Sequence, residues 1–160
     1  KIEKFIPAQK GKTHVLHIIR ELLSFEPSSA GTDIAQALQY FSNAQKRHCT
    51  AFLISDFIGV EGLEKPLMIA SNRHEVNAIQ IYDRRETELP NVGLVKFHDA
   101  ETGQDLWVDT AVASVREQYA SEWKQNQSRI EQLCTKTGVK RMSVRTDEDY
   151  VKALMKLFKS

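Results

Sequence analysis

Hydrophobic and polar positions along the chain follow two periods, and these periods predict helices that alternate with strands. Apolar positions that recur about every 3.6 residues predict helices over residues 13–23, 33–46, 63–72, 111–136 and from 147 onward. Short runs of apolar residues predict strands over residues 2–6, 50–55, 75–82 and 139–144. The run at 50–55 is continuous, which is typical of a strand buried on both faces of a parallel sheet, and residues 75–82 are expected to form another buried strand. The alternation therefore predicts an α/β fold, with a mostly parallel sheet flanked by helices.

Helix ends are predicted from residues that suit caps. Thr13 is expected to cap the first helix, Gly138 to end the long helix, and the pair Thr146-Asp147 to cap the last one. In the last helix one face is predicted to be buried, and its residues are Tyr150, Val151, Leu154, Leu157 and Phe158. Residues 27–31 (PSSAG) read as a loop.

One stretch has the period of an antiparallel hairpin. Residues 93–98 and 104–109 alternate apolar and polar side chains around the turn sequence DAETG at 99–103. We expect a β-hairpin with one packed face and one wet face, added to the parallel sheet.

Composition narrows the class of protein. A length of 160 residues suits one domain. With 22 Lys and Arg against 21 Asp and Glu, the formal net charge of +1 argues against a nucleic-acid binder. No apolar run approaches the ~20 residues of a membrane span, and no signal peptide is recognisable.

Cys49 and Cys134 are expected to be reduced thiols, as in a cytoplasmic protein. Because the first residue is Lys1 rather than Met, we expect a fragment of a longer chain.

Polar side chains lie where the predicted elements meet the carboxyl edge of the sheet, the usual ligand position in open α/β sheets. Six of them are candidate site residues: Thr32, Asp33, Ser55, Asp56, Asp83 and Glu86. Hydroxyl and carboxylate oxygens are hard ligands that suit Mg²⁺. The alternatives are local: Thr32 and Asp33 as a helix cap, Asp56 as a turn residue, and residues 83–86 (DRRE) as a salt-bridged turn.

Enzyme chemistry finds little support in the motifs. The five histidines show no zinc-type spacing, and the chain has neither a Gly-rich phosphate loop nor a Gly-x-Ser-x-Gly nucleophile elbow. An enzyme would have to use Asp56, Asp83 and Glu86 as acid and base groups, without a nucleophile or cofactor. We therefore expect a protein that is not an enzyme.

Five strings occur in the order and spacing of a known family: GTDIAQAL at 31–38, FLISDF at 52–57, DRRE at 83–86, LPxxG at 89–93 and DAETG at 99–103. Over essentially its whole length the chain resembles the bacterial domain of unknown function 58 family, a branch of the von Willebrand factor A-like proteins. The resemblance implies a Rossmann-like von Willebrand A fold with a metal-ion-dependent adhesion site built from three loops. Thr32 matches the second loop and Asp56 the third.

The first loop of that site, Asp-x-Ser-x-Ser, has no match in these residues. The chain is therefore interpreted as a partial von Willebrand A-like domain over 1–160, incomplete at its N-terminus. We expect Mg²⁺ in the full-length form but weak or no binding by this chain, since two oxygen ligands hold the ion poorly. A missing strand would also leave an open sheet edge beside residues 50–55, through which the chain could self-associate.

The resemblance further implies a cytoplasmic or membrane-associated adaptor that works beside MoxR-type AAA+ ATPases. The expected function is a non-catalytic protein-interaction module, in which Thr32 and Asp56 ligate the metal and Asp33 caps a helix. The hairpin at 93–109 is expected to form a second contact surface. Two alternatives stay open: a metal-dependent hydrolase that uses Asp56 and Asp83, and a purely structural domain without metal.

Overall fold

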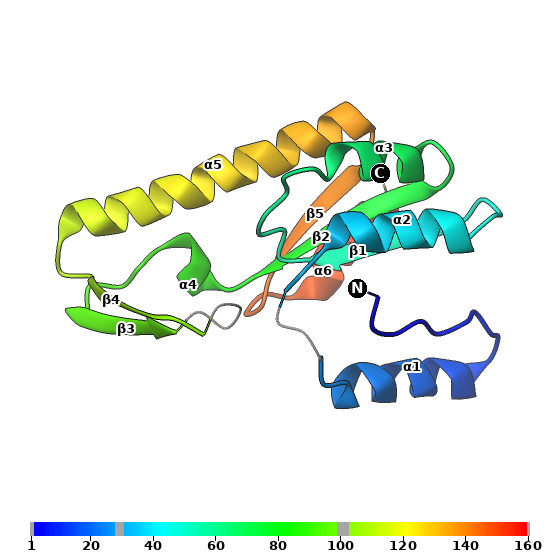
Figure 1. Ribbon diagram of the computed structural model, residues 1–160, viewed down its shortest axis with the longest axis horizontal. Helices are drawn as coiled ribbons and strands as arrows, with labels where there is room; N and C mark the ends of the chain where they lie inside the picture. Colours follow the sequence, from blue (N-terminus) through cyan, green and yellow to red (C-terminus); the bar gives the residue numbers. More distant parts are fainter. Residues whose placement is uncertain (1, 28–30, 99–102, 160) are drawn as a thin grey trace.

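The computed structural model describes residues 2–27, 31–98 and 103–159, with side chains in the last helix described up to residue 155. Helices and strands alternate along most of the chain, which confirms the predicted α/β class (Figure 1). The elements are α1 (Lys12–Ser24), α2 (Ile34–Ala44), β1 (Thr50–Ser55), α3 (Glu64–Ser71), β2 (Glu75–Tyr82), α4 (Arg84–Thr87), β3 (Leu94–His98), β4 (Asp105–Asp109), α5 (Ala113–Thr137), β5 (Lys140–Arg145) and α6 (Tyr150–Lys159).

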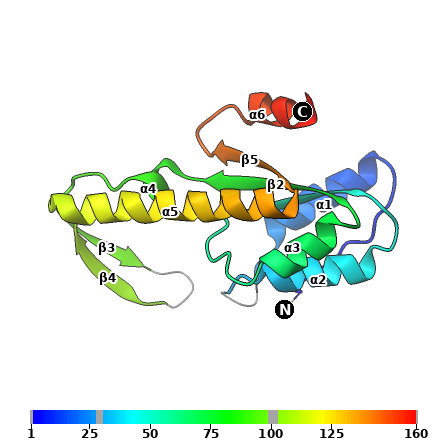
Figure 2. The same ribbon diagram turned by 90° about the horizontal axis from the view of Figure 1, so that it is seen from above.

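Three strands form a parallel sheet in the order β1-β2-β5, and β3 and β4 form a separate antiparallel hairpin. Both the parallel sheet and the added hairpin are confirmed, although turn residues 99–102 lie outside the described part. Figure 2 shows α6 on one face of the sheet, and α3 and α5 on the other. The C-terminal end of α5 is also as predicted, since Gly138 follows it in the left-handed conformation at φ 67°.

The main hydrophobic core lies between the sheet and the helices α2, α3 and α5. It contains buried apolar residues of α2, the β1–α3 loop, α3, β2, α5 and the α5–β5 connection, namely Ile34, Leu38, Phe57, Leu63, Leu67, Ala70, Val76, Ala78, Ile130, Cys134 and Val139. β2 supplies the centre because its residues 76–80 are buried without interruption, as the apolar run predicted.

β1 differs from that prediction because it is an edge strand in the described part of the chain. Its side chains alternate between half-buried and exposed, and Ile54 is 59% exposed. Ala51 and Leu53 pack against the core, whereas Phe52 and Ile54 on the opposite face of the strand are partly exposed. The prediction of a strand buried on both faces is therefore wrong for β1, whereas the open edge is confirmed.

Two predictions near the N-terminus are also wrong. Residues 2–6 form no strand, because no described strand lies beside them to complete a hydrogen-bonded ladder. Instead the ring of Phe5 meets that of Tyr40 edge-on, at 5.7 Å between centroids. α1 begins after Gly11 with no side-chain cap, so Thr13 lies inside the helix rather than at its cap.

The last helix is capped by a residue that was not predicted. The Asp149 carboxylate accepts a hydrogen bond from the Val151 backbone N–H at 3.0 Å, so Thr146-Asp147 is not the cap. Tyr150 and Val151 are exposed at the start of α6, which makes the predicted buried face wrong there. The side chains of Leu157 and Phe158 lie outside the described part.

The hairpin is fastened at its base to the start of α5. Buried Thr110 donates from both its backbone N–H and its hydroxyl to the Gly93 carbonyl, at 2.8 and 2.7 Å. Its hydroxyl accepts from the Val92 N–H at 3.0 Å, and its carbonyl accepts from Arg116 at 2.6 Å. Gly93 has φ 80°, a conformation that glycine adopts without strain. These bonds fix the angle at which the hairpin leaves α5, beyond the end of the sheet (Figure 1).

Candidate functional site

The carboxyl ends of β1, β2 and β5 lie at one edge of the sheet, as the parallel register requires. In that register Ser55 pairs with Gln80, so Asp56 follows β1 at the level of Ile81, and Asp83 follows β2 two residues further on. At about 3.3 Å per residue, the two aspartates are offset by about 7 Å along the strand direction. Asp56 and Asp83 therefore follow neighbouring strands but are staggered along the edge.

The loop after β1 presents Asp56 to solvent and buries the next residue. One carboxylate oxygen of Asp56 accepts from the Ile58 backbone N–H at 3.1 Å and from the Ser55 hydroxyl at 3.2 Å. The Ser55 hydroxyl in turn accepts from the Phe57 N–H at 3.1 Å. Phe57 is 1% exposed and has φ 57°, an uncommon value for a bulky residue. Asp56 is thus both a turn residue and an exposed carboxylate on a firmly anchored loop.

The sequence after β2 forms a one-turn helix with a capping box. Asp83 accepts from the Arg85 N–H at 2.8 Å, and Glu86 accepts from the Asp83 N–H at 2.8 Å. The Thr146 hydroxyl also donates to Asp83, at 3.1 Å. These bonds, that of Arg85 first, hold the pKa of Asp83 below its ordinary value. The predicted salt-bridged turn is wrong for Asp83 and Glu86, because in the described residues their carboxylates accept backbone N–H groups and the Thr146 hydroxyl and form no ion pair with an arginine.

Asp33 is the N-cap of α2, and its carboxylate accepts from the Gln36 N–H at 2.8 Å. The helix-cap interpretation of Asp33 is thereby confirmed. Thr32 is exposed beside it, and no hydrogen bond joins Thr32 to Asp56 in the described residues.

These side chains do not fit a complete magnesium site. Thr32 and Asp56 offer two oxygen ligands, whereas Mg²⁺ requires near-octahedral coordination. One Asp56 oxygen is already engaged by the Ser55 hydroxyl and the Ile58 N–H. Residues 2–27, 31–98 and 103–159 contain no group of three or more His, Cys, Asp or Glu side chains placed to hold a metal ion.

A buried polar network lies behind the Asp56 loop and was not predicted. Gln80, fully buried in β2, donates to the Asp56 carbonyl at 3.1 Å and accepts from Arg141 at 2.8 Å. Arg141 also bonds the side chain of Gln127 on α5, and Ser143 donates to Gln80 at 3.2 Å. The sequence signal was a glutamine within the apolar run of β2, a position that is costly unless fully bonded. This network ties the loop to the centre of the sheet.

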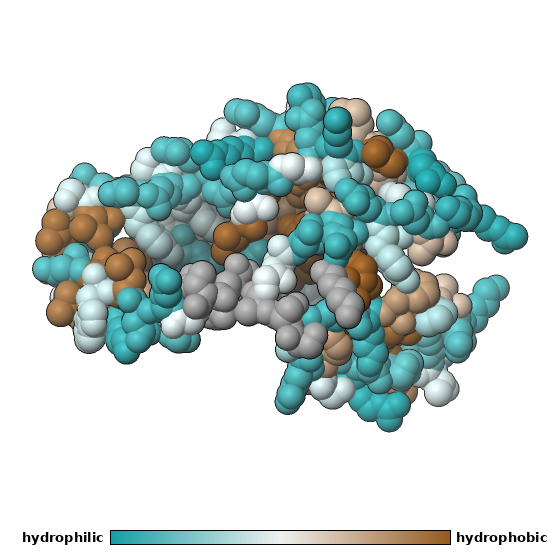
Figure 3. Space-filling model, in the orientation of Figure 1, coloured by the Kyte–Doolittle hydropathy of each residue, from teal (hydrophilic) through white to brown (hydrophobic). Residues whose placement is uncertain are grey.

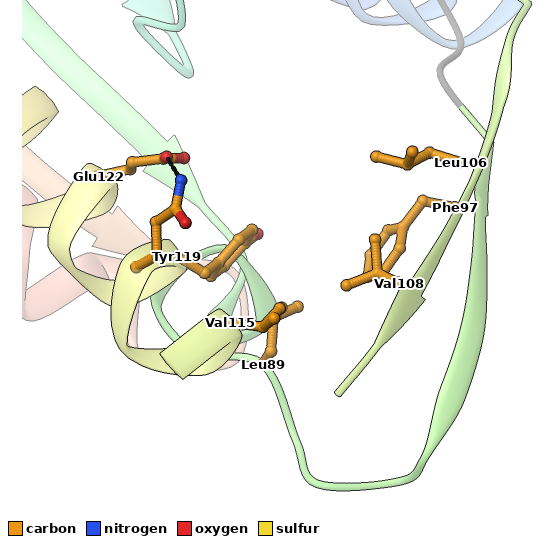
Figure 4. Close-up of a pocket in the computed structure, with 8 residues that line it drawn as sticks. Leu89, Phe97, Leu106, Val108, Val115, Tyr119 and Glu122 are labelled. Atoms are coloured by element: carbon orange, nitrogen blue, oxygen red, sulfur yellow. Dashed lines mark hydrogen bonds between the residues drawn. The ribbon is translucent and has the colours of Figure 1, made fainter. Parts of the chain in front are cut away.

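A second unpredicted feature is an apolar cleft between the hairpin and α5, with a volume of about 490 Å³. Figure 4 shows Phe97, Leu106 and Val108 pointing from the hairpin across open space toward Val115 and Leu89. The cleft is also lined by Gln118, Tyr119 and Glu122 of α5. Figure 3 shows hydrophobic side chains gathered at this end of the molecule. The spacing of the hairpin residues predicted which side chains share a side of the hairpin, but not that this side lies opposite α5.

The histidine and cysteine side chains of the described residues form no metal-binding cluster. Cys49 and Cys134 are free thiols. The Cys49 sulfur lies 3.6 Å from Nδ1 of His74, whose pKa is lowered by burial. None of the described helices is both long and apolar enough to cross a bilayer.

Comparison with known proteins places these observations in a family context. Residues 1–129 match the family described as "Protein of unknown function DUF58". The chain is 29% identical over 159 residues to the uncharacterized protein MAV169 of Mycobacterium avium, with 97% of this chain and 92% of that protein covered. It is 30% identical over 159 residues to the uncharacterized proteins Rv1480 of Mycobacterium tuberculosis and Mb1516 of Mycobacterium bovis. In those two matches the chain spans 49% of the relative. No solved structure matches.

Proposed function

Since the chain belongs to the DUF58 family, we propose that it is a non-catalytic protein-interaction module with a von Willebrand A-like fold. The parallel order of β1, β2 and β5 and the helices on both faces support that finer fold assignment. The positions of Thr32 before α2 and Asp56 after β1 also agree with the second and third loops of an adhesion site.

The observation that carries the proposal is the Asp56 loop. Phe57 holds the loop through a buried ring and a left-handed backbone, and its carbonyl accepts from Asn126 at 3.3 Å. The Asp56 carbonyl is bonded to buried Gln80. The second carboxylate oxygen of Asp56 receives no hydrogen bond within the described chain and faces solvent. Strained backbone that is held in place by its surroundings is concentrated at functional sites.

Binding agrees with the geometry better than hydrolysis does. Asp83 and Glu86 stabilise the turn at α4 through backbone hydrogen bonds, and Asp33 caps α2. Asp83 is staggered from Asp56 along the sheet edge, so the two do not form the close pair that acid and base catalysis by these carboxylates would need. Exposed oxygens at the ends of the strands can instead meet a partner.

For the metal, we propose that the full-length form supplies the ligands that these residues lack, so that an adhesion site with Mg²⁺ assembles around Thr32 and Asp56. The present chain then binds Mg²⁺ weakly or not at all. Titration calorimetry with MgCl₂ should show no saturable heat at micromolar concentrations, and a micromolar Kd would contradict this part of the proposal.

We further propose that the partner is a MoxR-type AAA+ ATPase and that the module acts in the cytoplasm, as the family resemblance implies. Two free thiols, Cys49 and Cys134, are consistent with a reducing compartment. The open edge of β1 offers a route to self-association of the isolated chain. Sedimentation that is strictly monomeric at all concentrations would contradict this last point.

The experiment compares Asp56→Ala with Asp149→Ala in the complete gene product. Asp149 is a matched control because it is also an exposed aspartate that accepts a backbone N–H, that of Val151 at 3.0 Å, and it lies outside the hairpin and the Asp56 loop. We expect Asp56→Ala to abolish capture of the purified ATPase while Asp149→Ala retains it, with no turnover of phosphate or carboxylic esters by any form. Turnover that disappears in Asp56→Ala would favour a hydrolase. Binding unaffected by Asp56→Ala and by EDTA would favour a purely structural role for the loop.

A further inference from the structure

The hairpin directs one apolar face at α5 and leaves a gap there. Cross-strand partners share a face, so Phe97 with Leu106 and Val95 with Val108 lie on one side, and Lys96 with Trp107 on the other. The apolar side faces the cleft (Figure 4). A two-stranded hairpin is marginally stable without packing on this face.

Hydrogen bonds at the base of the hairpin fix the two walls of the cleft relative to each other. The bonds of Thr110 to Gly93 and of Arg116 to the Thr110 carbonyl fix the base of the hairpin against α5. Leu106 remains 64% exposed and Phe97 37% exposed inside this frame. A volume of about 490 Å³ lies within the usual range of ligand pockets, so the gap has room for a few apolar side chains.

Uncompensated negative charge lies beside the apolar part of the cleft. An adjoining cavity of about 480 Å³ shares Tyr119 and Glu122 with the cleft and is also lined by Glu61, Glu86 and Arg129, of which Arg129 pairs with Glu61 at 3.8 Å. Within the described residues, one oxygen of Glu86 is buried without a hydrogen-bond partner, and Glu122 accepts only from the neutral amide of Gln118, at 2.9 Å. In the described part of the chain neither carboxylate is paired with a Lys or Arg.

Tyr119 lines both cavities, and its pKa is affected by the same two carboxylates. Its hydroxyl donates to the Arg85 carbonyl at 3.2 Å. Burial raises the pKa of Tyr119, and the carboxylates of Glu86 and Glu122 raise it further. A positive group at this point would find two carboxylates and a low-dielectric wall, which strengthens the attraction between charges.

We propose that the cleft between the hairpin and α5 binds an amphipathic basic segment of a partner protein. The segment inserts apolar side chains between Phe97, Leu106 and Val115, and places a Lys or Arg beside Glu86 and Glu122. This is the chemistry of a helix in a groove, with apolar anchors and a complementary charge. The inference goes beyond the proposed adhesion site because it uses neither metal nor Asp56.

The test measures fluorescence anisotropy with a fluorescein-labelled, 18-residue amphipathic helix of Leu and Lys as the probe, in EDTA. A matched peptide carries Glu in place of every Lys. The wild-type chain should bind the Lys peptide at least tenfold more tightly than the Glu peptide. Leu106→Ser should weaken the Lys peptide at least tenfold, whereas Trp107→Ser, on the opposite face of the same strand, should change it less than twofold. Asp56→Ala should bind as the wild type does, which separates this result from the adhesion site.

A charge variant tests the other half of the site without disturbing packing. Glu122→Gln is nearly isosteric and should weaken the Lys peptide about fivefold, while Glu117→Gln, on the same helix but outside the cleft, should not. Equal binding of both peptides, equal effects of the Leu106 and Trp107 variants, or no binding would overturn the proposal. So would a concentration-dependent dimer that Leu106→Ser dissociates, since a second copy would then be the occupant.

Discussion

Phe57 gives the sharpest test of how the Asp56 loop is built. Its ring is buried in the main core, while its backbone has φ 57°. Truncation of a buried phenylalanine costs about 3–5 kcal/mol in the free energy of unfolding. Left-handed backbone costs a residue with a Cβ about 1–2 kcal/mol, and costs glycine almost nothing. We therefore expect Phe57→Gly to be more stable than Phe57→Ala by about 1 kcal/mol.

Leu67 is the matched control, because it is fully buried in the interior of α3. There glycine is about 0.8–1.0 kcal/mol less favourable than alanine, so Leu67→Gly should be less stable than Leu67→Ala. The assay is urea unfolding followed by circular dichroism, with all four variants in one sucrose-containing buffer that keeps them folded. If Phe57→Gly is as unstable as Phe57→Ala while the Leu67 pair behaves as expected, Phe57 is not a strained anchor.

Three further predictions concern groups around the sheet. Hydrogen bonds from the Arg85 backbone and the Thr146 hydroxyl lower the pKa of Asp83, so the stability that its carboxylate contributes is present above about pH 4 and is lost as the pH falls further. Thr146→Val should raise this pKa in a carboxyl NMR titration, and an unchanged pKa would contradict the assignment. Burial lowers the pKa of His74, so as the pH falls the unfolded chain takes up a proton before the folded chain does, and the free energy of unfolding should fall below about pH 6.5. The free energy of unfolding of His74→Gln should depend less on pH, and the same pH dependence as in the wild type would refute this. Arg141→Met should cost about 1–3 kcal/mol, and combination with Gln80→Leu should cost less than the sum in urea titrations, whereas strict additivity would mean that the two side chains are not coupled.

Periodicity was sufficient for the parts of the fold that local sequence determines. The alternation at 93–98 and 104–109 predicted the hairpin, and the pattern at 75–82 predicted the buried strand that lies at the centre of the sheet. Gly138 predicted the end of α5 because few other residues adopt a left-handed cap without strain. These signals operate over a few residues and need no knowledge of what packs against them.

Predictions failed where a distant neighbour decides the outcome. The apolar run of β1 resembles that of β2, but β1 has a strand on one side only in the described chain, so Ile54 is exposed. Thr146 and Asp149 are both good capping residues. Thr146 instead bonds Asp83, 63 residues away, and Asp149 is left to cap α6. Sequence spacing cannot choose between such partners.

The candidate site was predictable to a similar degree. The strand-end position of Asp56 and the capping role of Asp33 follow from local pattern. The Gln80–Arg141 bond joins β2 to β5, across 61 residues, and the cleft beside Tyr119 depends on the angle of the hairpin. Neither arrangement has a sequence motif, because both arise only when separate elements pack together.

Binding of the purified MoxR-type ATPase to the complete gene product tests the central claim most directly. The Kd should be measured by biolayer interferometry for the wild type and Asp56→Ala, each with Mg²⁺ and with EDTA. The account predicts a Kd at least tenfold higher for Asp56→Ala, equivalent to about 1.4 kcal/mol, and a similar loss for the wild type in EDTA. The same Kd in all four measurements would contradict a binding role for the Asp56 loop.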